Sequence, residues 1–154
     1  MNEIILEVMQ SQQEQAARRG VEIRRELNAG LPLVRGHKAQ LQEVIVNLMN
    51  NAVEAMASST GRFRLLSVKT GLRGGDGIAV EIQDSGPGID PERLGGVFDA
   101  FVTTKPDGTG LGLAICRMII EHHGGELTAS SDGRSGAMFR FVLPVMNGDA
   151  VRSA

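Results

Sequence analysis

Three polar side chains recur at helical spacing near the middle of the chain. Glu43, Asn47 and Asn51 stand four residues apart, which places them along one edge of a predicted helix, beside its apolar stripe. Their oxygen atoms suit Mg²⁺, which takes one or two protein ligands together with phosphate oxygens. The spacing is therefore compatible with a cleft in which this helix edge meets a metal ion and a phosphorylated ligand, and equally with ordinary polar residues on a helix surface.

A carboxylate, Asp84, closes an apolar run and opens the segment Asp-Ser-Gly-Pro-Gly-Ile. At the mouth of a pocket this carboxylate would accept a hydrogen bond from the exocyclic amine of adenine, whereas guanine presents a carbonyl there. Gly86 and Gly88 let the backbone approach a flat base and take positive φ angles, and Ile89 completes the segment. By itself the segment is also compatible with an ordinary turn.

A second glycine-rich segment leads into a helix predicted over 110–122. Its alternating glycines do not fit a dinucleotide fingerprint, because the third glycine of that pattern would have to stand at Leu113. The segment instead indicates a flexible lid ending at a helix N-terminus, where free N–H groups suit a triphosphate. The candidate ligand-binding residues of this lid are Phe101, Thr103, Thr104, Lys105, Gly108, Thr109, Gly110, Leu111, Gly112 and Leu113.

The residues ahead of these glycines have alternative roles. We expect Phe98 and Phe101 to pin the base of the lid to the core. Lys105 either places its charge against the γ-phosphate or is a solvated loop lysine. Thr103 and Thr104 either bond phosphate or cap a turn.

Four blocks in one order carry a family resemblance. They begin at Asn47 (NLMNNA), Asp84 (DSGPGI), Phe101 (FVTTK) and Gly108 (GTGLGL). Together they resemble the ATP-binding catalytic domain of sensor histidine kinases, within the superfamily that includes DNA gyrase, Hsp90 and MutL. The resemblance covers the chain from about Asn2 to Pro144.

The resemblance implies roles for individual residues. It implies that Asn51 binds Mg²⁺ and that Asp84 reads the adenine of ATP. It also places Asn47 on the phosphate side and makes Asn47 and Lys105 the catalytic residues.

The resemblance also implies transfer of phosphate rather than its hydrolysis. Gyrase and MutL carry a water-activating Glu four residues before the metal-binding Asn, where this chain has Asn47. An Asn cannot act as a general base near neutral pH. Glu43 is the nearest other base, and its role stays open.

The function implied is the transfer of the γ-phosphate of Mg-ATP to a histidine on a separate dimerisation domain, with a response regulator receiver domain as a further partner. His37, His122 and His123 are not followed by the acidic residue expected of the family's phosphoacceptor. The alternatives are an anti-sigma-factor-type Ser/Thr kinase of the same fold and a non-catalytic nucleotide-binding signalling module.

The length, composition and charge limit which other classes of protein the chain could belong to. A chain of 154 residues with 42% hydrophobic content suits one domain with one core. A net charge of −2 gives no electrostatic reason to expect nucleic acid. No run approaches the roughly 20 apolar residues of a membrane span. We therefore expect a cytoplasmic domain that does not contact the membrane, although its parent protein could be anchored there. The single cysteine, Cys116, is expected to be a buried thiol.

Periodicity and turn residues predict the elements that position these groups. Their order indicates a mixed β-sheet packed on α-helices along one face, a two-layer α/β sandwich that the resemblance identifies with the Bergerat fold. The domain is expected over 1–146, followed by a flexible C-terminal tail over 147–154. Helices are predicted over 3–19, 37–57, 110–122 and from 90, and strands over 21–27, 33–35, 62–70, 78–84, 127–130 and 137–143, with a glycine-rich hairpin loop over 71–77.

Overall fold

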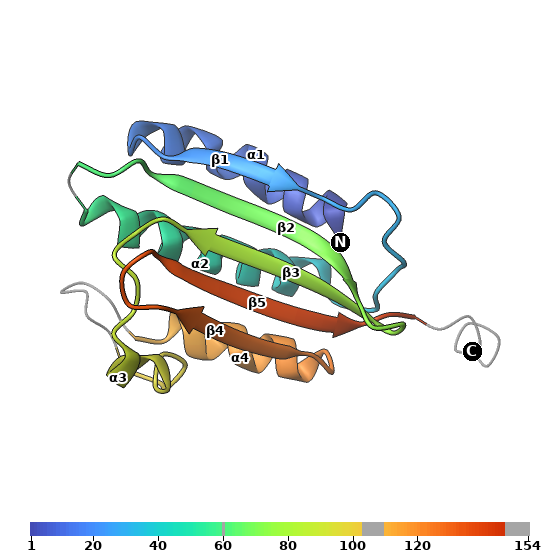
Figure 1. Ribbon diagram of the computed structural model, residues 1–154. Helices are drawn as coiled ribbons and strands as arrows, with labels where there is room; N and C mark the ends of the chain where they lie inside the picture. The colour runs from blue at the N-terminus through green and yellow to red at the C-terminus, as the bar shows by residue number, and fades with distance from the viewer. Residues whose placement is uncertain (60, 103–109, 147–154) are drawn as a thin grey trace.

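A computed structural model describes residues 1–59, 61–102 and 110–146 of the chain. It has two layers, a five-stranded sheet and a layer of helices (Figure 1). The helices are α1 (Asn2–Arg18), α2 (Lys38–Ala57), α3 (Pro91–Leu94) and α4 (Gly112–His122). The strands are β1 (Glu22–Glu26), β2 (Leu65–Arg73), β3 (Gly77–Asp84), β4 (Glu126–Ser131) and β5 (Ala137–Pro144).

The sheet is mixed, as the sequence predicts. Its strands lie in the order β1-β2-β3-β5-β4. β1 pairs with β2 in parallel, with Glu22 opposite Leu65, and every other neighbouring pair is antiparallel. The central strands alternate buried and less buried residues, so one face of the sheet packs on the core.

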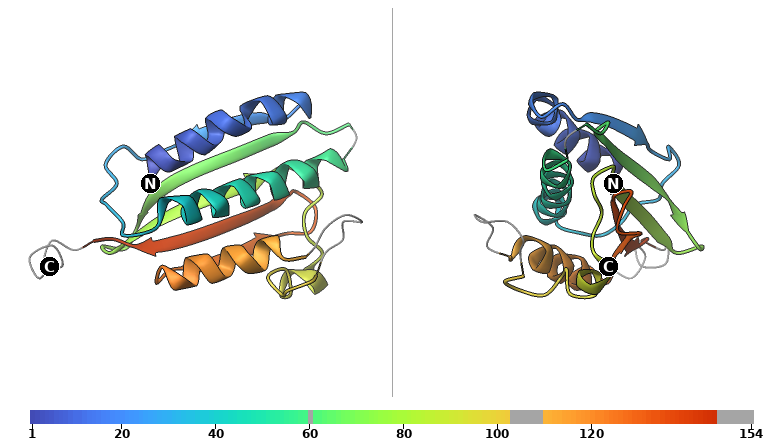
Figure 2. Two further views of the ribbon diagram at one scale, coloured as in Figure 1. Left: turned by 180° about the vertical axis from the view of Figure 1, so that it is seen from behind. Right: turned by 60° about the vertical axis from the view of Figure 1, so that its left-hand side comes forward.

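The long helices α1, α2 and α4 all cover that one face (Figure 2). α2 runs along the middle of the sheet, and its apolar stripe is buried in the core, with Leu48 and Met56 fully inaccessible. Their spacing follows the helical period, which is why the sequence predicts this helix correctly. None of the helices in the described part of the chain is long and apolar enough to cross a membrane.

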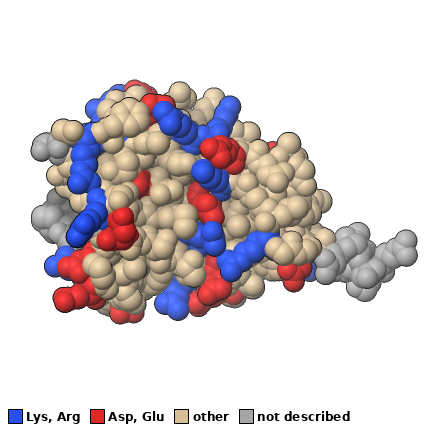
Figure 3. Space-filling model, in the orientation of Figure 1, with Lys and Arg blue, Asp and Glu red and all other residues tan. Residues whose placement is uncertain are grey.

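The other face of the sheet carries charges of both signs (Figure 3). Glu26, Lys69, Glu81 and Arg140 stand opposite one another in successive neighbouring strands. Arg140 donates to Oε1 of Glu81 from Nε at 3.0 Å and from Nη2 at 2.6 Å. Because the signs alternate across the strands, this face presents no uniform field to a charged partner.

Some element boundaries differ from the prediction. The strand expected over 33–35 is reduced to one antiparallel bridge between Val34 and Val145. The hairpin loop is shorter than 71–77, because the β2–β3 ladder continues through Gly71 to Arg73. The short helix α3 begins as predicted, since Oδ1 of Asp90 accepts a hydrogen bond from the N–H of Glu92 at 3.0 Å.

The fold brings several element ends together at one end of the sheet, on the left in Figure 1. β3 ends there at Asp84, β4 ends at Ser131, and β5 begins at Ala137. α4 begins beside them at Gly112. The predicted domain boundary at residue 146 stays a prediction, and the predicted tail over 147–154 lies outside the described residues.

Candidate nucleotide-binding site

Asp84 is a buried carboxylate at the end of β3, and only 4% of its surface is exposed. Its Oδ1 accepts hydrogen bonds from the N–H of Gly86 at 2.8 Å and of Ala137 at 3.3 Å. Burial raises the pKa of Asp84, and these two hydrogen bonds oppose that rise. Since both bonds end on Oδ1, we expect Oδ2 to meet the amino group of a base.

The two glycines that follow Asp84 differ in what they require. Gly88 has a φ of 84°, as predicted, and a Cβ there would come within 2.8 Å of the Ser131 hydroxyl. Gly86 does not adopt the positive φ predicted for it. A side chain at Gly86 would instead approach Oδ1 of Asp84 at 3.0 Å and the main chain of Ala55 at 3.4 Å. Close packing on α2 therefore explains Gly86.

The polar edge of α2 lies beside α4. Asn47 and Asn51 are half-buried, whereas Glu43 is exposed. The thiol of Cys116 on α4 donates to the carbonyl of Val44 on α2 at 3.9 Å, and Asn47 and Glu43 both act on the pKa of that thiol. The polar edge predicted from the spacing therefore lies where α2 packs against α4. Asn51 lies about one helical turn further toward the end of α2 that is near Asp84.

Cys116 is the buried thiol that the sequence predicts. Burial is the main cause that raises its pKa, to about 11, with the charge of Glu43 adding to the rise and Asn47 opposing it. A thiol with this pKa is almost entirely protonated near neutral pH, which excludes it as a nucleophile there.

A main-chain hydrogen bond joins the two ends of the predicted lid, at Phe101 and Gly110. The N–H of Phe101 donates to the carbonyl of Gly110 at 2.9 Å, and both residues have positive φ angles, 68° and 70°. The expectation that the ring of Phe101 packs on the core is wrong, because 75% of this residue is exposed. Phe98 does pack as expected, in edge-to-face contact with Phe139 and with Arg117 over its ring.

The start of α4 lies directly after this closure. The helix begins at Gly112, two residues later than predicted, because the left-handed φ of Gly110 is incompatible with a helix. The N-cap residue of this helix, Leu111, supplies no side-chain cap. The N–H groups of the first turn, which includes Gly112 and Leu113, are therefore suited to an anion. The remaining lid candidates, Thr103, Thr104, Lys105, Gly108 and Thr109, lie outside the described residues.

Two connections that the sequence does not reveal hold the Asp84 segment in place. Nη1 of Arg62 donates to the carbonyls of Gly86 at 3.4 Å and Arg134 at 2.8 Å. The hydroxyl of Ser131 accepts the N–H of Ile89 at 2.9 Å. Neither residue belongs to a recognisable motif. Arg62 reaches the segment from just before β2 and Ser131 from the end of β4, so these contacts follow only from the order of the strands in the sheet.

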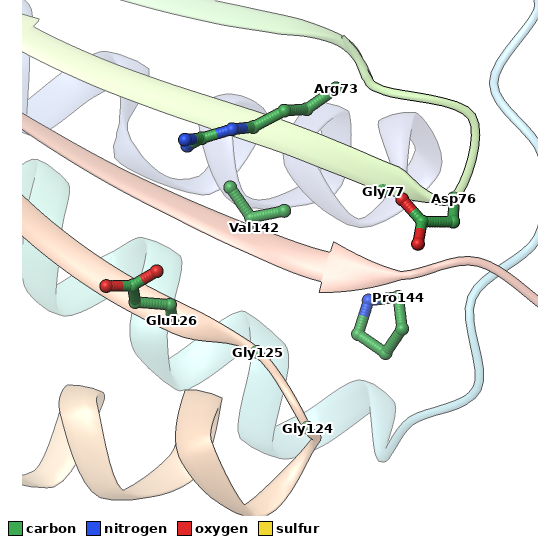
Figure 4. A pocket seen from close by; sticks show the side chains of 8 residues that line it. All are labelled: Arg73, Asp76, Gly77, Gly124, Gly125, Glu126, Val142 and Pro144. Carbon is green, nitrogen blue, oxygen red and sulfur yellow. The ribbon is translucent and has the colours of Figure 1, made fainter.

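Two cavities at the opposite end of the sheet do not coincide with this site. One, of about 380 Å³, is lined by described residues around Val142, with Arg73 and Glu126 on either side (Figure 4). The other, of about 490 Å³, lies beside His37, His122 and His123. No group of three His, Cys, Asp or Glu side chains within the described ranges is placed to hold a metal ion. Among the predicted ligand-binding residues, the segment from Asp84 to Ile89 and the start of α4 lie at the Asp84 end, whereas Asn47 lies near the middle of α2.

Comparison with known proteins gives a consistent result. Residues 36–147 match the family described as histidine kinase-, DNA gyrase B- and HSP90-like ATPase. The sensor protein FixL of Bradyrhizobium diazoefficiens is 43% identical over 129 residues, which cover 84% of this chain and 25% of that protein. The sensor histidine kinase ZraS of Salmonella typhimurium is 36% identical over 146 residues, covering 95% of this chain and 30% of that protein. This chain thus spans about a quarter to a third of these relatives.

Solved structures show the same fold. The nucleotide-free catalytic domain of the histidine kinase ThkA has a TM-score of 0.79 and 32% identity, with 94% of this chain and 91% of that chain covered. Histidine kinase ThkA in complex with the response regulator TrrA has a TM-score of 0.78 and 29% identity, with 95% of this chain and 40% of that chain covered. Full-length ShkA in complex with AMPPNP has a TM-score of 0.82 and 26% identity, with 94% of this chain and 30% of that chain covered. The predicted α/β sandwich is confirmed.

Proposed function

Because this chain belongs to the family of histidine kinase-, DNA gyrase B- and HSP90-like ATPases, we propose that it is the catalytic domain of a sensor histidine kinase. It binds Mg-ATP and donates the γ-phosphate to a histidine on a separate helical dimerisation domain. The named relatives, a sensor protein and a sensor histidine kinase, favour this function over the Ser/Thr kinase and the non-catalytic module.

The observation that carries the proposal is the buried carboxylate of Asp84. Its Oδ1 is held by two main-chain N–H groups, so its orientation does not depend on a ligand. A preoriented acceptor in a dry site binds the amino group of adenine and opposes the carbonyl of guanine. This arrangement supports ATP as the phosphate donor.

The donor set on α2 fits Mg²⁺. Asn51 offers a half-buried amide oxygen, which is a hard ligand, and Asn47 lies one turn away on the same edge. Mg²⁺ bound with phosphate oxygens and waters needs only one or two such protein ligands. The ion would neutralise charge on the phosphates, while Asn51 holds it and the helix edge orients the triphosphate toward α4.

The accepting histidine is expected on another domain. Within this chain, Nε2 of His123 accepts the N–H of His37 at 3.0 Å, and Nδ1 lies 2.7 Å from the carbonyl of Ile119. Both ring nitrogens of His123 are therefore engaged far from the Asp84 end. A response regulator receiver domain is the expected next acceptor, in line with the ThkA–TrrA complex.

Labelling with γ-labelled ATP tests the proposal. The chain alone should bind Mg-ATP without becoming labelled, because positioning an acceptor is most of phosphoryl transfer. Adding the parent protein's histidine-bearing helical domain in trans should produce label on that domain, which is lost in acid and retained in alkali as phosphohistidine is. Rapid phosphate release by the chain alone would indicate an ATPase. Acid-stable label on a protein serine would indicate the Ser/Thr kinase.

A further inference from the structure

The hydroxyl of Ser131, at the end of β4, makes three hydrogen bonds to the main chain. It accepts the N–H of Ile89 at 2.9 Å and of Gly133 at 3.1 Å, and it donates to the carbonyl of Gly136 at 2.7 Å. A hydroxyl offers one donor and two acceptor positions. The hydrogen-bonding capacity of Ser131 is therefore fully used.

These bonds join the two main-chain segments that hold Asp84. Ile89 ends the segment that Asp84 opens, and Gly136 directly precedes Ala137. The N–H of Ala137 is one of the two donors to Oδ1 of Asp84. The hydroxyl thus bridges the segment that follows the carboxylate and the segment that supplies one of its hydrogen bonds.

The two main-chain segments on either side of this bridge lie in close contact. A Cβ on Gly88 would lie 2.8 Å from Oγ of Ser131. Gly136 has a φ of 103°, and a Cβ there would lie 2.0 Å from the carbonyl oxygen of Asp84. Both glycines are required because the Asp84 segment and the β4–β5 turn touch through their main chains.

We propose that Ser131 is a positioning residue for adenine recognition. Its hydroxyl sets the spacing between the Asp84 segment and the start of β5, and so orients the Asp84 carboxylate. This inference rests on the proposed function, since it concerns how the same site reads its nucleotide. Without the hydroxyl, the N–H of Ile89 and the carbonyl of Gly136 lose their partner in a half-buried place. The turn then opens to water, and the hydrogen bond from Ala137 weakens.

The test compares Ser131→Ala with Ser135→Ala by calorimetry, using Mg-ADP and Mg-GDP. Ser135 lies in the same turn, and its hydroxyl donates only locally, to Oδ2 of Asp132 at 2.5 Å. Ser131→Ala should lower the affinity for ADP about tenfold, the effect of losing one buried hydrogen bond, and should reduce the preference for ADP over GDP by a similar factor. Ser135→Ala should leave both quantities unchanged.

Two further measurements separate positioning from general destabilisation. Affinity for Mg-tripolyphosphate, which lacks a base, should be the same in Ser131→Ala and the unaltered chain. Should Ser131→Ala fail to fold, Ser131→Thr and Ser131→Val form a matched pair of equal shape, of which only Thr keeps the hydroxyl. Thr should retain the ADP preference and Val should lose it. Equal preferences in Thr and Val would overturn the inference.

The outcomes distinguish this inference from the proposed function. An unaltered chain that binds ADP and GDP equally would refute the adenine site itself. An unaltered chain that prefers ADP, together with a Ser131→Ala variant that keeps the full preference, would refute the role of Ser131 alone.

Discussion

The main-chain N–H of Phe101 and the carbonyl of Gly110 are joined by a hydrogen bond of 2.9 Å. Phe101 and Gly110 are therefore held side by side directly before α4. The close approach depends on glycine, because a Cβ at residue 110 would lie 2.4 Å from the carbonyl carbon of Phe101. This hydrogen bond therefore fixes the position of the first turn of α4 beside the Asp84 end of the sheet.

Gly110→Ala should weaken ATP binding at least about tenfold while the domain still folds. The new methyl group clashes with Phe101, and the left-handed φ of 70° costs about 1–2 kcal/mol for a residue with a side chain. Nucleotide titration and thermal melting check both effects. The matched control is Gly95→Ala, at a φ of −65° with no atom within 4 Å. Unchanged ATP affinity in Gly110→Ala would show that the closure is not needed.

Asp84→Asn should reverse the polarity of base recognition. The amide oxygen can still accept the N–H groups of Gly86 and Ala137, which leaves an NH₂ group to face the base. That donor opposes the amino group of adenine and suits the carbonyl of guanine. We expect ADP affinity to fall by about 100-fold or more and the ADP-over-GDP preference to disappear, measured by calorimetry. An unchanged preference would remove Asp84 from the base site.

The same substitution should alter the pH dependence of stability in the absence of nucleotide. Burial raises the pKa of Asp84 above its ordinary 3.8, so ionising this group in the folded state opposes folding. The destabilisation is absent well below pH 3.8, grows as the pH rises through 3.8, and is complete above the folded-state pKa. Asp84→Asn should therefore melt at a higher temperature than the unaltered chain at pH 7, and the difference should shrink toward pH 4. A lower melting temperature at pH 7 would contradict this assignment.

Asn51→Ala should remove the strengthening of ATP binding by Mg²⁺. The variant loses an amide oxygen that we propose as a metal ligand, while alanine keeps the helix intact. ATP affinity measured with Mg²⁺ and with a chelator checks this. Asn50→Ala, at the preceding position of the same helix, serves as the control. If Mg²⁺ strengthens binding equally in Asn51→Ala and the unaltered chain, another residue holds the metal.

Cys116 should react slowly with iodoacetamide in the folded protein. A pKa of about 11 lowers the thiolate fraction at pH 8 by about 100-fold relative to a free cysteine, and burial limits access further. Mass spectrometry of the intact chain follows the reaction, since the chain has a single cysteine. The same protein in denaturant should label rapidly. Equally fast labelling of the folded chain would show that α4 does not bury this thiol.

Sequence patterns identify the parts of the site that depend on local structure. The stripe through Leu48 and Met56 follows the helical period, so α2 and its polar edge at Asn47 and Asn51 could be predicted. The apolar run before Asp84 likewise predicts that this carboxylate ends a strand. Periodicity reports which face of an element is apolar, and this property is local in the chain.

Local patterns fail where the conformation of a residue depends on a contact with a distant part of the main chain. The apolar ring of Phe101 predicts a place in the core, yet this residue is exposed, because the hydrogen bond to Gly110 holds its main chain in a left-handed turn. Gly86 was expected at a positive φ, but close packing against α2 explains it.

The sequence by itself determines that this chain forms helices and strands of the observed kinds, in an order that gives a two-layer sandwich, and that Asp84 and the α2 amides are candidates for one site. Only the tertiary structure decides that Ser131 and Gly136 contact the segment that Asp84 opens. They meet the Asp84 segment because β5 lies between β3 and β4 and because its register places Met138 opposite Gln83, which brings Ala137 next to Asp84. Strand order and register arise from the packing of the whole core, so no local pattern in the chain encodes them.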